Sequence, residues 1–172
     1  QGRMKALERM EKIAPTYADS PFTFRFPEFE KTSSTLIDLD QVSIGYDKPI
    51  VSANITLLHD SRYALLGPNG AGKSSLIKTL VGDLATLSGQ VVPSEHLKIG
   101  YFAQHQLEAL DMEANGLLHL QRLKPGASEQ ELRNFLGVFG WQGERIFEPV
   151  KHFSGVEKVR LALAMIAIQK PN

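Results

Sequence analysis

The sequence predicts an α/β protein in which a glycine-rich loop joins a strand to a helix. Three observations indicate this class. Residues 35–104 contain several short strand patterns and one helical pattern, and the patterns between residues 107 and 149 are helical. Between an apolar run and an amphipathic run lies the stretch "LLGPNGAGKSSLIKTLVGDL" at 65–84. A strand, a tight loop and a helix in that order are typical of α/β domains.

The first element is a helix near the start of the chain. In "RMKALERMEKI" at 3–13, apolar side chains recur at the spacing of one helical face, and Pro15 ends the pattern. These side chains are Ala6, Leu7, Met10 and Ile13. The pattern begins without a cap, so we interpret it as the tail of a longer helix.

The second element is a short aromatic segment, "PFTFRFPEF" at 21–29. Phe22, Phe24 and Phe26 alternate with polar residues between two prolines, which predicts an edge strand that packs its rings on the domain. The alternative is a platform for nucleobases, because three rings on one face can stack bases. The flanking prolines and the sparse basic charge favour the edge strand.

Further strands are expected on both sides of a single helix. Strand patterns occupy residues 35–46, 53–60, 62–67, 89–93 and 98–104, and the helical pattern occupies 73–81. The strand at 62–67 therefore runs into the glycine-rich loop, and the helix follows it.

Two capping boxes define the later helices. Ser128 precedes Glu131 by three residues and opens an amphipathic helix that Gly140 ends. Ser154 precedes Glu157 in the same way, and the helix that follows is apolar on nearly all sides to residue 168. That second helix is expected to be buried on most of its surface.

Composition excludes several classes of protein. The 172 residues are 42% hydrophobic, enough for a core, and 19 basic residues balance 19 acidic ones. The balanced net charge therefore does not indicate non-specific electrostatic binding to nucleic acid. There is no cysteine, no apolar run approaches the roughly 18 residues of a membrane span, and residues 1–12 are charged throughout. We expect a cytoplasmic protein without membrane insertion.

The glycine-rich loop matches the pattern G-x-x-x-x-G-K-[ST]. Its glycines allow the backbone N–H groups to turn inward, and the following helix adds its positive end. Lys73 can neutralise the outer phosphates, and the Ser74 hydroxyl can ligate Mg²⁺. We therefore expect a nucleoside triphosphate at Gly67, Pro68, Asn69, Gly70, Ala71, Gly72, Lys73, Ser74 and Ser75.

Three other features carry little weight when each is taken alone. Tyr46 could stack on a base, but taken alone it is better interpreted as an ordinary surface tyrosine. Gln104, at the end of the last predicted strand, could ligate Mg²⁺ and orient a water molecule. The stretch "FSGVE" at 153–157 could be no more than a capping box.

Taken together and in this order, these features resemble the nucleotide-binding domain of ABC proteins. That family shows an aromatic residue, a Walker A loop, a glutamine loop, a helical segment and an "LSGGQ" signature, and the resemblance covers residues 32–172. The finer likeness is to the ABC-F subfamily, most of all its bacterial YheS branch. It rests on Glu157 and Lys158 in the signature, on "GYFAQHQ" at 100–106, and on residues 1–31, which resemble the end of an inter-domain linker.

The resemblance implies a fold and a set of roles. The fold is a P-loop α/β core with an antiparallel β subdomain and a helical subdomain. Tyr46 would stack on adenine, residues 67–75 would hold the phosphates with Ser74 on Mg²⁺, and Gln104 would sense Mg²⁺ and the γ-phosphate. The signature residues would face ATP on the other nucleotide-binding domain of the same polypeptide: Ser154, Gly155, Val156 and Glu157. ABC-F proteins act on the ribosome, so ribosome and tRNA are the implied partners.

Two departures from the family pattern qualify this prediction. Val156 stands where the signature has its second glycine. The chain also ends at "KPN", before the strand that carries the family's Mg²⁺-binding aspartate and catalytic glutamate. We therefore expect an incomplete core sheet, and no ATP hydrolysis by this chain alone. The alternatives are the ATPase subunit of a membrane transporter and a non-catalytic nucleotide-binding module.

Overall fold

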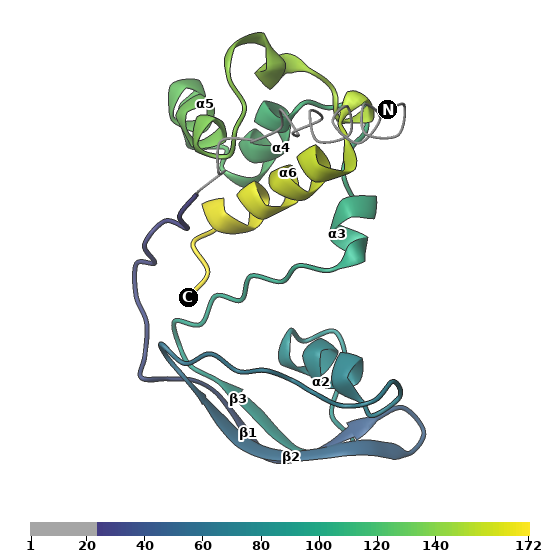
Figure 1. Ribbon diagram of the computed structural model, residues 1–172. Coiled ribbons are helices and arrows are strands. Elements are labelled where there is room, and N and C mark those ends of the chain that lie inside the picture. The colour runs from purple at the N-terminus through teal and green to yellow at the C-terminus, as the bar shows by residue number, and fades with distance from the viewer. Residues whose placement is uncertain (1–23) are drawn as a thin grey trace, which may run out of the picture.

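The computed structural model describes residues 24–172, which form two groups of elements (Figure 1). The sheet group consists of three strands and helix α2. The helical group consists of helices α3 to α6 with two short 3₁₀ turns. Long connections without regular structure run between the groups, one before β1 and one after β3.

The sheet group is built on an antiparallel sheet with the strand order β2-β1-β3. The strands are β1 (Thr35–Gly45), β2 (Pro49–Leu58) and β3 (Ser88–Pro93), so the strand predictions for 35–46 and 89–93 are confirmed. Leu39 lies opposite Ile55 of β2 and Val91 of β3, which places all three side chains on one face. On that face Leu39, Val42 and Ile44 pack with Leu76 of α2.

A bulge in β1 explains one glycine of β3. The register of β1 shifts between Leu39 and Val42, and Gln41 within this bulge has a φ of 46°. Opposite it, Gly89 has a φ of 76°, and a Cβ there would lie 2.2 Å from the Gln41 carbonyl oxygen. Glycine is thus required at this position, both by the left-handed backbone and by the close approach of β1.

Helix α2 (Lys73–Leu80) confirms the predicted helix at 73–81, with Val81 as its C-cap. Its buried side chains are Ser75, Leu76 and Thr79, spaced to form one face. The Thr79 hydroxyl donates to the Ser75 carbonyl oxygen at 2.9 Å, which satisfies a polar group against the sheet.

The helical group comprises α3 (Gln104–Glu108), α4 (Gly116–Leu123), α5 (Glu129–Val138) and α6 (Gly155–Ile168). Two 3₁₀ turns, Gly143–Phe147 and Val150–His152, connect α5 to α6. A contiguous core joins these elements and includes Leu120, Leu132, Leu136, Phe139, Val150 and Leu161. Among the described helices, none is long and apolar enough to cross a bilayer.

Both predicted capping boxes are confirmed. Ser128 accepts the Glu131 N–H at 3.2 Å, and Ser154 accepts the Glu157 N–H at 3.2 Å. Each glutamate returns a carboxylate oxygen to the backbone N–H of its serine. After α5, Gly140 has a φ of 99°, as expected for the residue that ends a helix.

The strands predicted at 62–67 and 98–104 are wrong. Residues 61–68 and 97–103 have no regular structure, and Leu66 is 87% exposed. A core strand is stable only when neighbours pair its N–H and C=O groups, and neither segment has such a neighbour within the described residues. The Tyr63 hydroxyl instead accepts the Leu58 N–H at 3.1 Å. The prediction at 53–60 is right only as far as Leu58.

The edge strand predicted around the phenylalanines is also wrong for the residues that are described. Residues 24–29 form no strand, because Pro27 has no N–H and no strand lies alongside. Phe24 packs on Phe139 of the helical group, with ring centroids 4.8 Å apart, so its ring is covered rather than open to a base. Phe22 and the helix predicted at 3–13 lie outside the described residues.

Asn172 connects three distant segments. Its side-chain N–H₂ donates to the carbonyl oxygens of Lys31 (2.7 Å) and His96 (2.8 Å), and its side-chain oxygen accepts the Lys98 N–H (2.8 Å). Its backbone N–H also donates to the Lys98 carbonyl oxygen at 3.0 Å. In Figure 1 the end of the chain accordingly lies between the two long connections.

Candidate functional site

The glycine-rich loop adopts a conformation that only glycine tolerates at two positions. Gly70 has a φ of 85° and Gly72 a φ of 100°. A Cβ at Gly72 would also lie 2.8 Å from a methyl group of Val51 in β2. The end of the loop is therefore fixed against the start of β2, and α2 begins at the next residue. The first turn of α2 carries no acidic side chain, so its positive end is not neutralised from within.

Lys73 lies over this loop. Its Nζ donates to the Gly67 carbonyl oxygen and, at 3.5 Å, to the Pro68 carbonyl oxygen. These are weak acceptors compared with a phosphate oxygen, so an anion in the loop would offer the ammonium group better partners. Ser74 is exposed on the first turn of α2, whereas Ser75 is buried. An exposed hydroxyl beside this lysine fits the oxygen ligands that Mg²⁺ prefers.

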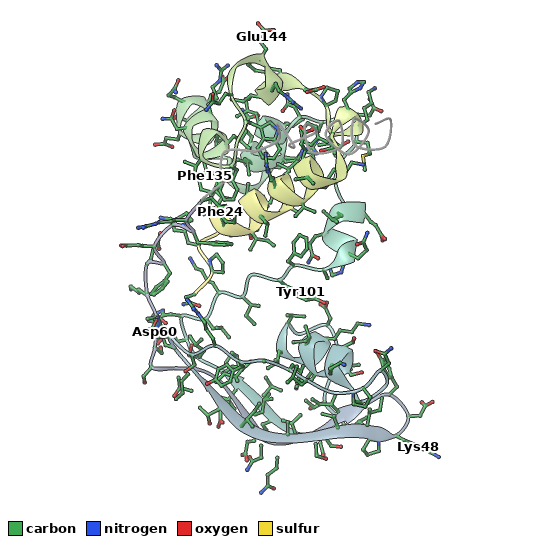
Figure 2. The ribbon with its side chains drawn as sticks, viewed as in Figure 1. Phe24, Lys48, Asp60, Tyr101, Phe135 and Glu144 are labelled. Atoms are coloured by element: carbon green, nitrogen blue, oxygen red, sulfur yellow. The ribbon has the colours of Figure 1, made fainter. Side chains whose placement is uncertain are left out.

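Tyr46 lies in the turn between β1 and β2 and is 58% exposed. The turn is tight, because a Cβ at Gly45 would lie 2.0 Å from the Lys48 carbonyl oxygen. Figure 2 labels Lys48 at the tip of this turn. Strand β2 leads directly from the turn to Val51, which contacts Gly72, so the turn and the glycine-rich loop share one end of the sheet group.

Gln104 does not lie at the end of a strand, as the sequence predicted, but at the start of α3. Its side chain is exposed, and the neighbouring Gln106 caps the helix by accepting the Ala103 N–H. Helix α3 packs with α6, and Figure 1 shows it among the helices, apart from α2. The structure therefore does not bring Gln104 to the glycine-rich loop.

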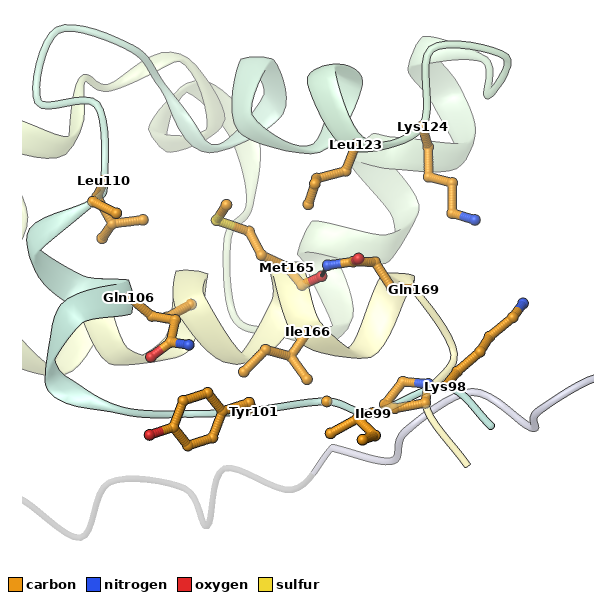
Figure 3. A pocket seen from close by; sticks show the side chains of 14 residues that line it. Lys98, Ile99, Tyr101, Gln106, Leu110, Leu123, Lys124, Met165, Ile166 and Gln169 are labelled. Carbon is orange, nitrogen blue, oxygen red and sulfur yellow. Dashed lines mark hydrogen bonds between the residues drawn. The ribbon is translucent and has the colours of Figure 1, made fainter. Parts of the chain in front are cut away.

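Two hollows flank segment 98–101, which belongs to no strand. One, of about 580 Å³, lies between this segment and the helices and is lined by Tyr101, Gln106 and Met165 among others (Figure 3). The other, of about 380 Å³, faces the sheet group and includes Leu57 and Ile77. Neither hollow is lined by a site residue that the sequence predicted.

The signature stretch forms the N-terminus of α6. Ser154 is the N-cap, and Val156, which is 64% exposed, occupies the second helical position. Because the Ser154 oxygen accepts the Glu157 N–H, the hydroxyl hydrogen remains available to another acceptor. The exposed first turn thus presents this hydroxyl next to the Val156 side chain.

The structure adds one residue that sequence reasoning missed. Arg145, on the 3₁₀ turn Gly143–Phe147, donates from Nη2 to the Glu157 carboxylate and lies 3.3 Å from Glu148. The Glu157 side chain is 22% exposed and is turned toward this guanidinium. Arg145 belongs to no motif and precedes Glu157 by twelve residues, so no pattern in the sequence indicates this pair.

Metal ligation by a carboxylate cluster is not a feature of the described part of the chain. Residues 24–172 contain no group of three or more histidine, aspartate or glutamate side chains that could hold a metal ion. The Ser74 hydroxyl is an exposed oxygen ligand at the end of the glycine-rich loop.

Comparisons with known proteins agree with the order of these motifs. Residues 51–172 match the sequence profile of the ABC transporter family. The chain is 49% identical over 174 residues to the protein named "Probable ATP-binding protein YheS" of Escherichia coli K12. It is 38% identical over 176 residues to the human ATP-binding cassette sub-family F member 3. Both alignments cover the whole chain, but the chain spans only 27% and 25% of these relatives.

Solved structures show the same fold at lower identity. The chain superposes on cbiO1 of Clostridium perfringens, part of the ABC transporter complex cbiONQ, with a TM-score of 0.60 and 19% identity, covering 81% of this chain and 63% of cbiO1. It also superposes on a bacterial Atm1-family ABC exporter with ATP bound, with a TM-score of 0.59 and 20% identity, covering 98% of this chain and 32% of the exporter. The chain therefore belongs to the ABC transporter family, as an ATP-binding domain related to the ABC-F proteins.

Proposed function

We propose that this chain is the second nucleotide-binding domain of an ABC-F type ATPase and that residues 67–75 bind Mg-ATP. The observation that carries the proposal is the loop before α2, where left-handed glycines free the backbone and Lys73 lies over the loop carbonyls. The names of the relatives support it, since YheS is named a probable ATP-binding protein and the human relative is an ATP-binding cassette protein.

In this proposal the loop binds phosphate through its backbone N–H groups and the positive end of α2. Lys73 exchanges the carbonyl oxygens of Gly67 and Pro68 for phosphate oxygens. Mg²⁺, when bound, spreads the charge of the phosphates, and the Ser74 hydroxyl would hold it. Tyr46, on the neighbouring turn, stacks on the adenine.

The helical group contributes to two sites in this proposal. Gln104 belongs to the site of its own domain and reaches it when the helical group moves toward the sheet group. Ser154, Gly155, Val156 and Glu157 face the nucleotide of the other domain. Since α3 packs on α6, one movement of the helical group displaces both sets of residues.

Nucleotide binding is tested first. Lys73→Ala should weaken Mg-ATP binding about ten- to a hundredfold, because a charge-assisted hydrogen bond contributes roughly 1.5–3 kcal/mol. The matched control is Lys78→Ala, which removes an exposed lysine from the last turn of the same helix and should leave the affinity unchanged. Calorimetry that gives equal affinities for Lys73→Ala and the unsubstituted protein would overturn the proposal.

The two capping boxes allow a controlled test of the signature. Ser154→Ala and Ser128→Ala each remove one N-cap with the same 3.2 Å hydrogen bond, so each should destabilise the protein by about 1 kcal/mol. In the full-length two-domain polypeptide with turnover blocked, only Ser154→Ala should lower the fraction closed at saturating ATP. If the closed fraction at saturating ATP is the same for both variants, Ser154 has no role beyond capping α6.

Val156 should weaken closure without affecting the affinity of this domain for ATP. Its exposed side chain adds bulk and apolar surface where a glycine would let the backbone approach a phosphate. Losing one or two charge-assisted hydrogen bonds costs roughly 1.5–3 kcal/mol each. Val156→Gly should therefore raise the closed fraction at a given ATP concentration, and equal closure would refute the steric argument.

Hydrolysis is proposed for the full-length polypeptide and not for this chain alone. Phosphoryl transfer depends on a group that positions the attacking water, and we assign no such group within this chain. A phosphate-release assay on the chain should give background rates, and activity that disappears in Lys73→Ala would contradict this. ATP binding without turnover in the full-length protein would favour the non-catalytic module instead.

The ribosome is the proposed partner of the full-length protein, with residues 1–31 as the end of a linker directed toward tRNA. ATP-dependent co-sedimentation with ribosomes that is lost in Lys73→Ala would support this. Co-purification with a membrane permease would favour the transporter alternative. Deleting residues 1–14 should leave the affinity for ATP unchanged within about twofold, because distant sites act additively.

A further inference from the structure

Glu157 poses an electrostatic problem for the proposed signature. It lies in the first turn of α6, whose positive end is expected to face a phosphate group. A carboxylate at that position cancels part of the helix charge and repels the phosphate. If the N-terminus of α6 faces a phosphate group, the Glu157 carboxylate must therefore lie turned away from it or be neutralised.

Arg145 is placed to turn the Glu157 carboxylate away and to neutralise it. One oxygen of Glu157 accepts the Ser154 backbone N–H at 3.4 Å, and the other accepts from Arg145 Nη2. These two contacts turn the carboxylate back onto its own helix and toward the 3₁₀ turn. Val156, the preceding residue, is exposed, whereas Glu157 is only partly exposed.

Arg145 is suited to this position for a second reason. It lies 3.3 Å from Glu148 as well as against Glu157, and its side chain is 57% exposed. A guanidinium has five N–H donors, so contacts to two carboxylates leave donors directed to solvent. The guanidinium therefore offsets part of the negative charge of Glu148 and Glu157 beside the first turn of α6.

We infer that Arg145 is a positioning residue for the signature: it holds the Glu157 carboxylate away from the facing nucleotide and thereby sets the ATP concentration at which the two domains close. This inference rests on the proposed function, because it assumes that the N-terminus of α6 meets ATP bound by the other domain. Arg145 acts through Glu157 and makes no contact with the reacting atoms in this role.

The test compares Arg145→Gln, Arg145→Lys and the double variant Arg145→Gln with Glu157→Gln in the full-length polypeptide. Arg145→Gln should raise the ATP concentration for half-maximal turnover about tenfold, as for one lost charge-assisted interaction, with kcat changed less than twofold. Arg145→Lys keeps the charge and should recover most of the loss. The double variant should require at least threefold less ATP than Arg145→Gln, because the carboxylate that needs neutralising is gone.

A merely structural salt bridge gives a different pattern. In that case the ATP concentration for half-maximal turnover rises by the same factor in Arg145→Gln, in Glu157→Gln and in the double variant. This result would overturn the inference, whatever Arg145→Lys shows. The matched control is Arg122→Gln, which removes an arginine on α4 that pairs with Asp111 at 2.9 Å, and its half-saturating ATP should stay within twofold. If the unsubstituted protein shows no ATP turnover, the proposed function fails first. If it turns over and Arg145→Gln behaves as the unsubstituted protein, only this inference fails.

Discussion

The helical group and the sheet group differ in how completely they enclose their apolar side chains. In the helical group, Leu120, Leu136 and Phe139 are fully buried in one contiguous core. In the sheet group, the core cluster contains four buried residues, three from β1 and Leu76 of α2. Apolar side chains of the irregular segments 61–68 and 97–103 remain open, as the exposed Leu66 and Ile99 show.

The difference follows from the kind of contact that each group needs. Helices satisfy their backbone groups internally, so α4, α5 and α6 require only apolar faces that meet. Segments 61–68 and 97–103 have apolar side chains, but their backbone groups need partner strands to form a sheet. Within the described residues these partners are absent, and the helical group is therefore the part expected to dominate stability.

The largest expected effect tests whether the helical group dominates the stability of the protein. Phe139→Ala removes a fully buried ring that contacts Phe24 and Phe135, and it should lower the free energy of unfolding by about 3–5 kcal/mol. Urea unfolding followed by the fluorescence of Trp141, the single tryptophan, reports on the same core. Val138→Ala, an exposed position next to it in the chain, is the control and should change stability by less than about 0.5 kcal/mol.

A second substitution asks whether the two groups unfold together. Gly89→Ala forces an alanine into a left-handed conformation, at about 1–3 kcal/mol, and also clashes with the Gln41 carbonyl oxygen. Backbone hydrogen exchange should accelerate in β1 and β3, while the midpoint of urea unfolding followed by Trp141 fluorescence should not change. An equal shift of the Trp141 transition would mean that the groups form one cooperative unit. Gly126→Ala is the control, since a Cβ there meets no atom within 4 Å.

A smaller effect is expected from a buried histidine of the helical group. His119 Nε2 accepts the Asp111 N–H at 3.0 Å, and Nδ1 lies 2.7 Å from the Asn115 carbonyl oxygen. His119→Leu should lower the free energy of unfolding by about 1–3 kcal/mol, because the Asp111 N–H loses its partner. The control is His105→Leu at an exposed position. Equal free energies of unfolding for His119→Leu and His105→Leu would show that the hydrogen bonds of His119 contribute little.

The smallest predicted effect is a shift in one titration. The Arg122 side chain, hydrogen-bonded at 2.9 Å, and the Glu113 N–H hold the pKa of the Asp111 carboxyl below its ordinary value of 3.8. Since the folded state binds this proton less tightly, the stabilisation is complete above pH 3.8 and is lost as the pH falls through the lowered pKa. NMR titration should place the midpoint below 3.8, and Arg122→Gln should raise it. An unchanged midpoint in Arg122→Gln would exclude this cause.

What the sequence predicted correctly was mostly local. The capping boxes at Ser128 and Ser154 involve residues three positions apart, and α2, α5 and α6 follow from short apolar periodicities. The need for glycine at Gly70 and Gly72 follows from a loop pattern whose backbone requirement is also local. Such features do not depend on how the rest of the chain is arranged.

What the sequence did not predict depends on distant partners. The strand assignments at 62–67 and 98–104 assumed neighbours that are not among the described residues, and Gln104 was placed on a strand for the same reason. The pair Arg145 and Glu157 joins two elements through a loop, and it follows no periodicity. Residue type alone indicates neither contact.

The hydrogen bonds of Asn172 have a mechanical consequence. They tie Lys31, His96 and Lys98 to the residue that lies a few positions beyond the end of α6. The segment before β1 is also attached to the helical group by the Glu30–Lys170 ion pair, at 3.8 Å, and by the contact of Phe24 with Phe139. Since these contacts all join the segment before β1 to the helical group or to the residues just after α6, a displacement of that segment should also displace the helix that carries Ser154.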